Sequence, residues 1–385
     1  MYKAKIIDFY SIKSFHEMFN LSFILMCSKI FSQVEVSLGK TSYDNLLLLS
    51  YNTASSIPKN VFIKVKNVCE KDTHWGAFFR MFIGGFRILK EYFFLFPNTT
   101  LILNYSNVFA FPILLLINRF LKKRLLIAFH GDLELLAGNP ISKSKPSFWY
   151  ACIYKLSFSR LLPPSNAKII VLGDSIRQNL LELYPSIEHN VISINHPYIF
   201  SDKKQCDSTG VKPLIIGILG RQDERKGLKQ LLYLAKHFEK HILSGKLIFK
   251  SIGAIPSEVN INEWKCIEWG SSQAMSRIIF EEQVSIVDYI LCLYPVDSYK
   301  FTASGVAMDA LRFLKPIIGL RNNYLKKLAE EYSIGFVVDT LDEVIKVIDA
   351  EIVNKSDTSL FKSEISKMRH TFGVSYNAEL LKRNL

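Results

Sequence analysis

With 385 residues, of which 49% are apolar, the chain is long enough for about two domains with large hydrophobic cores, and this composition excludes a disordered protein. Its formal net charge of +13 comes from lysines and arginines spread along the whole length, without the zinc-finger spacing, basic zipper or RNP-like motif of a nucleic-acid-binding protein. Phosphorylated small molecules or an anionic membrane surface explain the charge at least as well, so we expect no nucleic-acid partner.

The first 200 residues alternate predicted strands with predicted helices. The pattern of apolar residues predicts strands at 3–9, 45–51, 61–65, 101–105, 124–129, 168–172 and 191–195. It predicts helices at 15–31, 75–94, 148–161 and 175–183. Alternation of this kind is typical of a parallel sheet covered by helices, so residues 1–200 are expected to form one Rossmann-like domain.

The second half repeats this scheme after a polar stretch, 201–212, that we expect to be a linker. Strands are predicted at 214–219, 246–252, 266–269, 289–293, 316–320 and 335–338, with helices between them. Residues 213–369 are therefore expected to form a second Rossmann-like domain. The charged tail, 359–385, is predicted to be helical, and its part from about 370 to 385 to pack back on the first domain. The expected fold class is α/β, with two doubly wound domains facing a cleft and ligands at the carboxyl ends of the strands.

A basic loop follows the predicted strand 214–219. Gly220 allows a tight turn there, and Arg221, Arg225 and Lys226 stand before a helix with one apolar face. Free N–H groups and the helix dipole attract anions, and nearby cations add to this attraction, so the loop is a candidate diphosphate site. The alternative is an ordinary connection with solvated charges.

A second candidate element lies between residues 289 and 320. A strand is followed by a loop that contains Tyr299, then Ser304 and Gly305 open a helix, and Asp309 stands about one turn further on. A helix start binds phosphate, and a carboxylate one turn later can accept hydrogen bonds from ribose hydroxyls. The alternative is a capped amphipathic helix with a solvated Asp309.

The two elements together carry a family resemblance. GRQDERKG before an amphipathic helix, then SGVAMDALRFLKPII, resembles the C-terminal half of the group 1 (family 4-like) glycosyltransferases, which have the GT-B fold. The resemblance implies that Arg221 and Lys226 hold the nucleotide diphosphate and that Asp309 stands where the second glutamate of the family's E-x(7)-E helix binds ribose. Phe301 replaces the first glutamate, and Thr302-Ala303-Ser304 replaces Gly-Phe-Gly.

The resemblance also implies an activity and further contacts. The chain is expected to move a sugar from a nucleoside-diphosphate donor, UDP favoured, to a saccharide acceptor in O-antigen, capsule or exopolysaccharide synthesis. Gly220, Ser304 and Gly305 would line the diphosphate site, and Tyr299 and Thr302 would contact the sugar.

Three residues of the first half are catalytic candidates. His130, Gly131 and Asp132 follow a predicted strand, at the position from which this family often directs a histidine at the donor sugar. His16 lies after the first strand, where some inverting GT-B enzymes place a general base, and a neutral imidazole can take a proton near neutral pH. The alternatives are a loop histidine that caps the next helix and a structural histidine at a helix start.

We expect neither a metal nor another cofactor, with the nucleotide-sugar serving as co-substrate. The chain contains no D-x-D pair of the kind that chelates a bridging divalent ion in the other large glycosyltransferase fold. Protein cations and helix ends would neutralise the leaving diphosphate instead.

Several features bear on the cellular location. The six cysteines form no C-x-x-C motif, and the N-terminus lacks the layout of a secretory signal, so we expect a cytoplasmic protein. The uncharged segment 92–118 is interrupted by proline and asparagine, which argues against a membrane span. The residues 75–94 and 109–124 combine aromatic side chains with basic ones, and could lie on the anionic inner face of the plasma membrane near a lipid-linked acceptor. Alternatively, they cover a buried sheet.

Two other protein classes are alternatives to a glycosyltransferase. A nicotinamide-dependent dehydrogenase would need G-x-G-x-x-G after a strand, and the residues around Gly217 and Gly220 do not supply it. A non-catalytic two-domain protein that binds a nucleotide or a lipid surface remains the alternative.

Overall fold

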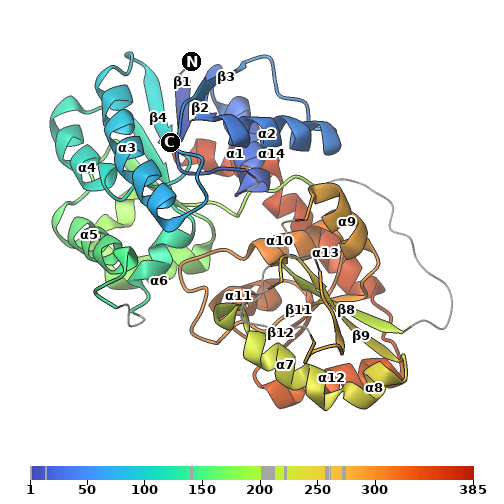
Figure 1. Cartoon of the computed structure of the whole chain (residues 1–385). Coiled ribbons are helices and arrows are strands. Elements are labelled where there is room, and N and C mark those ends of the chain that lie inside the picture. Colours follow the sequence, from blue (N-terminus) through green and yellow to red (C-terminus); the bar gives the residue numbers. More distant parts are fainter. Residues whose placement is uncertain are drawn as a thin grey trace. The chain divides into compact units, whose positions relative to one another are not determined.

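A computed structural model describes residues 2–13, 15–138, 142–200, 213–220, 223–255, 260, 262–270 and 275–385. The predicted linker 201–212 and the predicted site residue Arg221 lie outside these described residues. The chain divides into two units (Figure 1). The first unit comprises Met1–Ile199, Phe301–Ala303 and Thr371–Leu385, and the second comprises Phe200–Lys300 and Ser304–His370.

The first unit is built on a parallel sheet that has, in the described part of the chain, seven strands in the order β3-β2-β1-β4-β5-β6-β7. The strands are β1 (Lys3–Asp8), β2 (Gln33–Gly39), β3 (Val61–Lys66), β4 (Thr99–Leu103), β5 (Leu125–Ala128), β6 (Ala167–Val171) and β7 (Val191–Ser193). The helices are α1 (Glu17–Ile30), α2 (Lys40–Asn52), α3 (His74–Phe93), α4 (Ala110–Leu121), α5 (Pro146–Arg160), α6 (Asp174–Leu183) and α14 (Val374–Arg383). Two 3-10 turns, η1 (Gly131–Leu136) and η2 (Pro185–Asn190), complete it.

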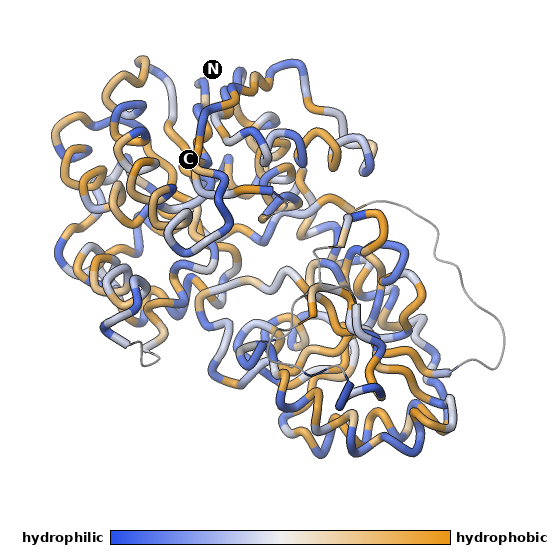
Figure 2. The backbone as a smooth tube through the Cα atoms, in the orientation of Figure 1, coloured by the Kyte–Doolittle hydropathy of each residue, from blue (hydrophilic) through white to orange (hydrophobic). Residues whose placement is uncertain are grey.

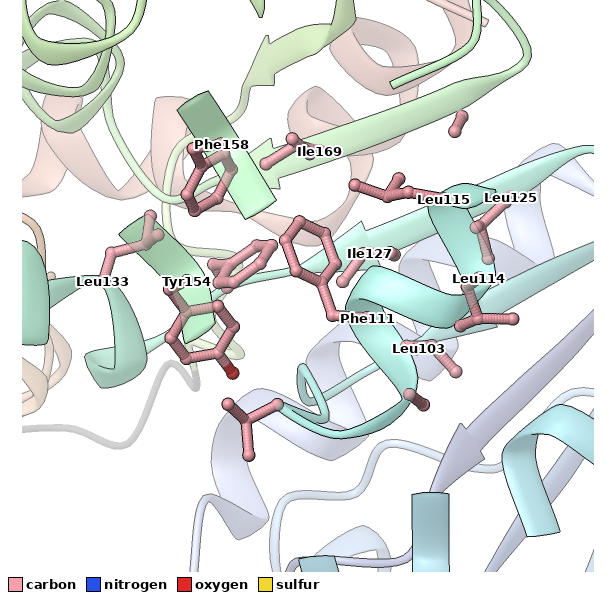
Figure 3. Packing of buried hydrophobic residues seen from close by; sticks show 14 of the residues in the cluster. Leu103, Phe111, Leu114, Leu115, Leu125, Ile127, Leu133, Tyr154, Phe158 and Ile169 are labelled. Carbon is pink, nitrogen blue, oxygen red and sulfur yellow. The ribbon is translucent and has the colours of Figure 1, made fainter. Parts of the chain in front are cut away.

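Helices cover both faces of the middle of this sheet, and the strands β4, β5 and β6 there are nearly continuous apolar runs. Side chains of a strand alternate between the two faces. Leu103, Ile127 and Ile169 face α4 and α5, where they pack around Phe111 and Phe158 (Figure 3). On the other face, α1 packs against α2 and α14. The central strands are thereby buried on both sides, whereas most of the outer strand β3 is exposed or half-buried.

The prediction of a strand at 45–51 is wrong, because this segment lies in helix α2. Leu46 and Leu49 are buried whereas Leu48 and Tyr51 are exposed, so the apolar run follows the period of a helix with one covered face. Leucine is also a better helix former than the β-branched residues that favour strands. The strand that the sequence interpretation missed is β2, whose side chains alternate in QVEVSLG.

The second unit has a parallel sheet that shows, among the described residues, six strands in the order β10-β9-β8-β11-β12-β13. The strands are β8 (Leu214–Leu219), β9 (Leu247–Ile252), β10 (Ile267–Glu268), β11 (Tyr289–Cys292), β12 (Ile317–Leu320) and β13 (Gly335–Val338). The helical elements are η3 (Glu224–Lys226), α7 (Leu228–His237), α8 (Glu239–Leu243), α9 (Arg277–Ser285), α10 (Gly305–Arg312), α11 (Asn323–Glu331), α12 (Leu341–Val353) and α13 (Ser359–Phe372). The core on one face of this sheet joins β8, β9 and β11 to α7 and α12.

Each sheet has one point at which the strand order reverses. In the first unit the chain leaves β1 for β2 and β3 on one side and returns to β4 on the other. In the second unit β8 is likewise flanked by β9 and β11. In open α/β sheets ligands bind outside the carboxyl ends of the strands at such a reversal. The topology therefore marks the loops after β1 and β4, and those after β8 and β11.

None of the helices in the described ranges is long and apolar enough to cross a membrane.

Candidate active site

A chain of buried polar groups shapes the edge of the first sheet. The Asp8 carboxylate, at the end of β1, accepts hydrogen bonds from the backbone N–H groups of Tyr10 (3.0 Å) and Ser11 (2.9 Å) and from the Asn20 amide (3.2 Å). The Asn20 oxygen in turn accepts from the Asn104 amide at 2.8 Å. These bonds fix the loops after β1 and β4 against each other, at the reversal of the strand order.

His130 is attached to the same network. Its Nε2 lies 2.9 Å from the backbone oxygen of Asn104, and since a carbonyl can only accept, Nε2 carries the proton. Burial, with smaller effects of His16 and His196, holds the pKa of His130 well below its usual range. A neutral ring with a protonated Nε2 leaves Nδ1 as an acceptor, which can receive a hydrogen bond from a sugar hydroxyl.

The structure brings His16 next to His130, with ring centroids 4.7 Å apart. His16 precedes α1 in a left-handed backbone conformation, with φ 58°, which is uncommon for a residue other than glycine and is concentrated at functional sites. Burial, and to a lesser extent the neighbouring His196, lower the pKa of His16 to about 4. His16 is therefore neutral near pH 7, but it is a weak proton acceptor.

Asp132 has a different environment at the start of η1. Its carboxylate accepts a hydrogen bond from the Tyr105 hydroxyl at 2.6 Å and another from Ser106, whose hydroxyl oxygen is 2.8 Å from that of Tyr154. Desolvation outweighs these hydrogen bonds and raises the pKa of Asp132 to about 6. A carboxylate with this pKa suits proton transfer near neutral pH better than His16 does.

Aromatic residues that the sequence interpretation did not single out line this edge. Tyr10 stacks on Tyr105 with ring centroids 4.3 Å apart, and Tyr105 is stacked at 5.8 Å from His130. Tyr105 is the last residue of the predicted strand 101–105, and it lies two residues after the end of β4, at the reversal of strand order. Its position at a strand end is the only sign in the sequence that Tyr105 belongs to the site. This sign can be used only when β1 and β4 are known to be neighbouring strands.

The predicted sugar contact Thr302 belongs to the first unit. Its hydroxyl donates to Glu134 at 3.1 Å, and the backbone N–H of Phe301 donates to the same carboxylate oxygen at 2.9 Å. Phe301 itself is buried in the core with Leu133 and Leu136. The residue that replaces the first glutamate of the family motif thus has a packing role.

The basic loop of the second unit begins at Gly220, where β8 ends. Gly220 has φ 74°, and a Cβ atom there would lie 3.2 Å from Nζ of Lys226. The Lys226 ammonium is therefore held over the backbone of the turn. Burial raises the pKa of Cys292, at the end of β11, to about 12, and the charge of Lys226 acts against this rise. Lys226 thus lies by the carboxyl ends of both strands at the reversal.

Gly227 fixes how this loop enters α7. Its φ is 83°, and a Cβ atom would lie 2.1 Å from the backbone oxygen of Leu293, so no other residue fits. Asp223 accepts a hydrogen bond from the backbone N–H of Lys226 at 3.1 Å. The turn is consequently rigid and packed directly against the strand that precedes the second predicted element.

That second element is the start of α10. The Ser304 hydroxyl caps the helix by accepting from the backbone N–H of Ala307 at 3.3 Å, and Ser304 is buried. Gly305 follows, and a Cβ atom added to it would meet nothing within 4 Å. The space in front of the helix start is open, as a phosphate site requires.

Asp309 lies one turn into α10, on the same side as Gly305. Arg277 of α9 donates to its carboxylate at 2.7 Å and also to Glu281 at 3.1 Å, and Glu281 pairs with Arg312 at 2.8 Å. A ribose bound at Asp309 would therefore share the carboxylate with Arg277.

The loop before α10 contains another predicted site residue, besides His16, that is not glycine and has a left-handed backbone conformation. Tyr299 has φ 58°, and its ring lies 4.4 Å from that of Tyr294. Such a conformation in a bulky residue is a marker of a functional loop. The predicted residues therefore gather at two edges: His16, His130 and Asp132 in the first unit, and Gly220, Lys226, Tyr299, Ser304, Gly305 and Asp309 in the second.

Comparisons with known proteins identify the fold. The sequence matches no protein-family model and no curated protein. Solved structures with a similar fold include S. aureus TarM in complex with fondaparinux, alpha-GlcNAc-glycerol and UDP (TM-score 0.66, 11% identity, covering 100% of this chain and 99% of that chain). They also include sucrose-phosphate synthase from Thermosynechococcus elongatus (TM-score 0.64, 11% identity, covering 100% of this chain and 98% of that chain).

A third similar structure is a glycosyltransferase from Rickettsia africae (TM-score 0.59, 16% identity, covering 99% of this chain and 96% of that chain). All three likenesses extend over nearly the whole chain, and the two parallel sheets agree with the predicted architecture. The chain therefore has the two-domain α/β fold of the GT-B glycosyltransferases, as the sequence predicted.

Proposed function

We propose that the chain is a glycosyltransferase that moves a sugar from a nucleoside-diphosphate donor, with UDP favoured, to a saccharide acceptor. The observation that carries the proposal is the position of the two family motifs. One follows β8 and the other follows β11, on the two sides of the strand-order reversal in the second sheet. Two separate sequence elements thereby converge where the fold class binds its ligands.

In this proposal the second unit holds the donor. Lys226, with Arg221, neutralises the negative charge that develops on the leaving diphosphate, and the start of α10 at Gly305 donates hydrogen bonds to it. Asp309 holds the ribose, and Tyr299 contacts the sugar. Preorganised cations of this kind act without a metal, so no metal is part of the proposal.

The first unit supplies the acceptor chemistry. The acceptor oxygen forms a bond to the anomeric carbon, and the bond from that carbon to the diphosphate oxygen breaks, with its electron pair leaving on UDP. The acceptor proton passes to Asp132, whose raised pKa of about 6 suits this task. His130 orients a sugar hydroxyl through Nδ1, and neutral His16 lies beside it.

We place this reaction in the synthesis of a bacterial surface saccharide, with a group 1 (family 4-like) type of activity and a lipid-linked acceptor. The basic loop motif supports the group 1 type of activity in surface-saccharide synthesis. The lipid-linked acceptor is supported by the aromatic and basic character of α3 and α4, which suits work on the cytoplasmic face of a membrane.

Thermal unfolding with UDP, GDP, ADP and NAD tests the donor assignment. A ligand that binds only the native state raises the midpoint of unfolding, so UDP should raise it most and NAD should leave it unchanged. UDP release from UDP-sugars in the presence of saccharide acceptors then tests the transfer. A chain that binds UDP but releases none from any donor would be the non-catalytic alternative.

A further inference from the structure

Helix α3 carries large apolar residues on its solvent-facing side as well as on its covered side. The covered side holds Met81, Ile88 and Tyr92 beside closely packed glycines, and Cβ atoms at Gly84 and Gly85 would lie 3.3 Å from Phe9 Cβ and 3.0 Å from Asn107 Oδ1. Its outer side carries large apolar residues at helical spacing: Trp75, Phe79, Phe82, Ile83 and Phe86. A helix in contact with water normally turns its apolar stripe inward.

This outer side continues onto α4, and the two helices lie next to each other. Phe82 lies 5.6 Å from Phe109, which precedes α4, and Phe109 lies 5.8 Å from Tyr150 of α5. Further large apolar residues are exposed on α4 itself, namely Ile113, Leu116 and Phe120. The region is mostly apolar in Figure 2. Exposed apolar residues gathered on two adjacent helices mark an interaction site.

The charges on this surface are almost all positive. The exposed or half-buried cations of α3 and α4 are Arg87, Lys90 and Arg119, followed by the basic turn 122–124, whereas Arg80 is buried. The single acidic residue of the two helices, Glu91, forms ion pairs with Lys5 and Lys66. Aromatic residues beside uncompensated cations are complementary to an anionic lipid headgroup region, where the rings lie in the acyl boundary and the cations meet phosphates.

A small pocket of about 170 Å³ opens at the edge of this surface, between α3 and the segment after β3. Phe79 and Ile83 of the apolar surface line it, together with Arg80 and Arg87. Both guanidinium groups donate to backbone carbonyls of residues 67–71, and within the described residues neither forms an ion pair with a carboxylate. Nε of buried Arg80 has no hydrogen-bond partner among the described residues.

We propose that the outer face of α3 and α4 is a docking surface for an anionic phospholipid bilayer, with the Arg80–Arg87 pocket receiving a lipid phosphate. The rings of α3 and α4 would enter the acyl boundary, and the charge of the two arginines would find its counterion in the phosphate. This surface brings the enzyme to a lipid-linked acceptor. Its purpose therefore rests on the proposed function, although its test does not.

Flotation of the full chain with lipid vesicles tests the proposal. Wild-type protein should bind phosphatidylcholine vesicles that contain phosphatidylglycerol more tightly than pure phosphatidylcholine vesicles. The double variant Phe79→Ser/Phe86→Ser should bind at least about tenfold more weakly, because two inserted rings are lost. Tyr233→Ser/Leu243→Ser removes two exposed apolar residues of the second unit and is the matched control, expected to bind like wild type.

Arg87→Gln tests the contribution of the pocket to vesicle binding separately from that of the apolar surface. It should weaken binding to the vesicles with phosphatidylglycerol and leave binding to pure phosphatidylcholine unchanged. Phe86→Trp keeps an aromatic ring and should bind like wild type, which shows that the serine variants lose insertion and not their fold. Equal binding of wild type and the serine variant would overturn the proposal.

Sedimentation tests whether the surface binds a second copy of the chain instead of a membrane. If the wild type sediments as a dimer that Phe79→Ser/Phe86→Ser converts to a monomer, the surface holds a second copy of the chain and the membrane proposal is wrong. UDP binding and transfer to a water-soluble acceptor are measured without vesicles. Failure of those assays would count against the proposed sugar transfer. Failure of vesicle binding would count against the docking surface and the support it gives to a lipid-linked acceptor, and would leave the proposed sugar transfer untouched.

Discussion

At the residue scale, Lys226 is the described side chain that bears most directly on the donor. Its Nζ lies over Gly220, at the end of β8, and its charge lowers the pKa of Cys292, at the end of β11. Lys226 therefore lies next to both strands at the reversal of strand order. Lys226→Ala should lower kcat/KM by at least about 10²-fold, the scale of losing one group that stabilises developing charge. Lys229→Ala, which removes an exposed lysine paired with Glu224, is the control and should keep the wild-type rate.

In the proposed function, Asp132 sets the pH dependence. With its pKa raised to about 6, the carboxyl is protonated below that pH and cannot accept the acceptor proton. We predict that kcat/KM rises with pH through about 6 and then levels off. Asp132→Asn should lose this rise and about 10²-fold or more of the rate.

The exposed Asp174→Asn, in the first turn of α6, is the control for this pair of measurements and should keep the rate and the pH profile of the wild type. A wild-type profile in Asp132→Asn would remove Asp132 from the chemistry. His16, with a pKa near 4, stays neutral over the same range and contributes no such step.

The sequence analysis selects His16, His130 and Asp132 one by one as candidates. The structure gathers them at one edge, with His16 and His130 in ring contact, and their roles stay predictions. Tyr105 and Ser106, which hold the Asp132 carboxylate, were not selected. Their importance arises from the pairing of β1 with β4, which is a property of the folded sheet.

At the scale of elements, the start of α10 allows a test that separates binding from stability. The open space at Gly305 accommodates a larger side chain, so Gly305→Val should leave the unfolding temperature nearly unchanged. The same side chain would occupy the place of the diphosphate and should weaken UDP binding by at least about tenfold, as measured by calorimetry. Unchanged UDP affinity would mean that α10 does not hold the diphosphate.

Secondary structure was predictable where burial covers both sides of a strand or one face of a helix. The strand β8 has the predicted bounds, and the helix α7 follows the basic loop as the apolar pattern indicates. The pattern failed at Leu46–Tyr51, because a run of leucines fits a helix as well as a strand and only tertiary contacts decide. The misread helix also hid β2, and with it the reversal of strand order next to β1.

At the scale of the whole molecule, the sequence predicted the fold class from its alternation of strands and helices, and the comparisons confirm it. The exposure of the aromatic residues of α3 could not be predicted, because the same aromatic pattern is expected of a helix that covers a sheet. Only the exposed fractions, such as 72% for Trp75 and 61% for Phe86, show which side faces outward.

The neutralisation of the diphosphate by protein groups makes a prediction for the whole enzyme. Because lysine and arginine side chains and helix starts serve this purpose in the proposal, excess EDTA should leave turnover unchanged. Abolished turnover that Mg²⁺ or Mn²⁺ restores would instead assign the charge stabilisation to a metal ion.

A crystal structure of the chain with UDP tests the central claim most directly. The account predicts the diphosphate at the carboxyl ends of β8 and β11, with Nζ of Lys226 and the backbone N–H groups at Gly305 within hydrogen-bond distance of its oxygens. A diphosphate bound away from this reversal of strand order, or one that touches only one of the two loops, would contradict it.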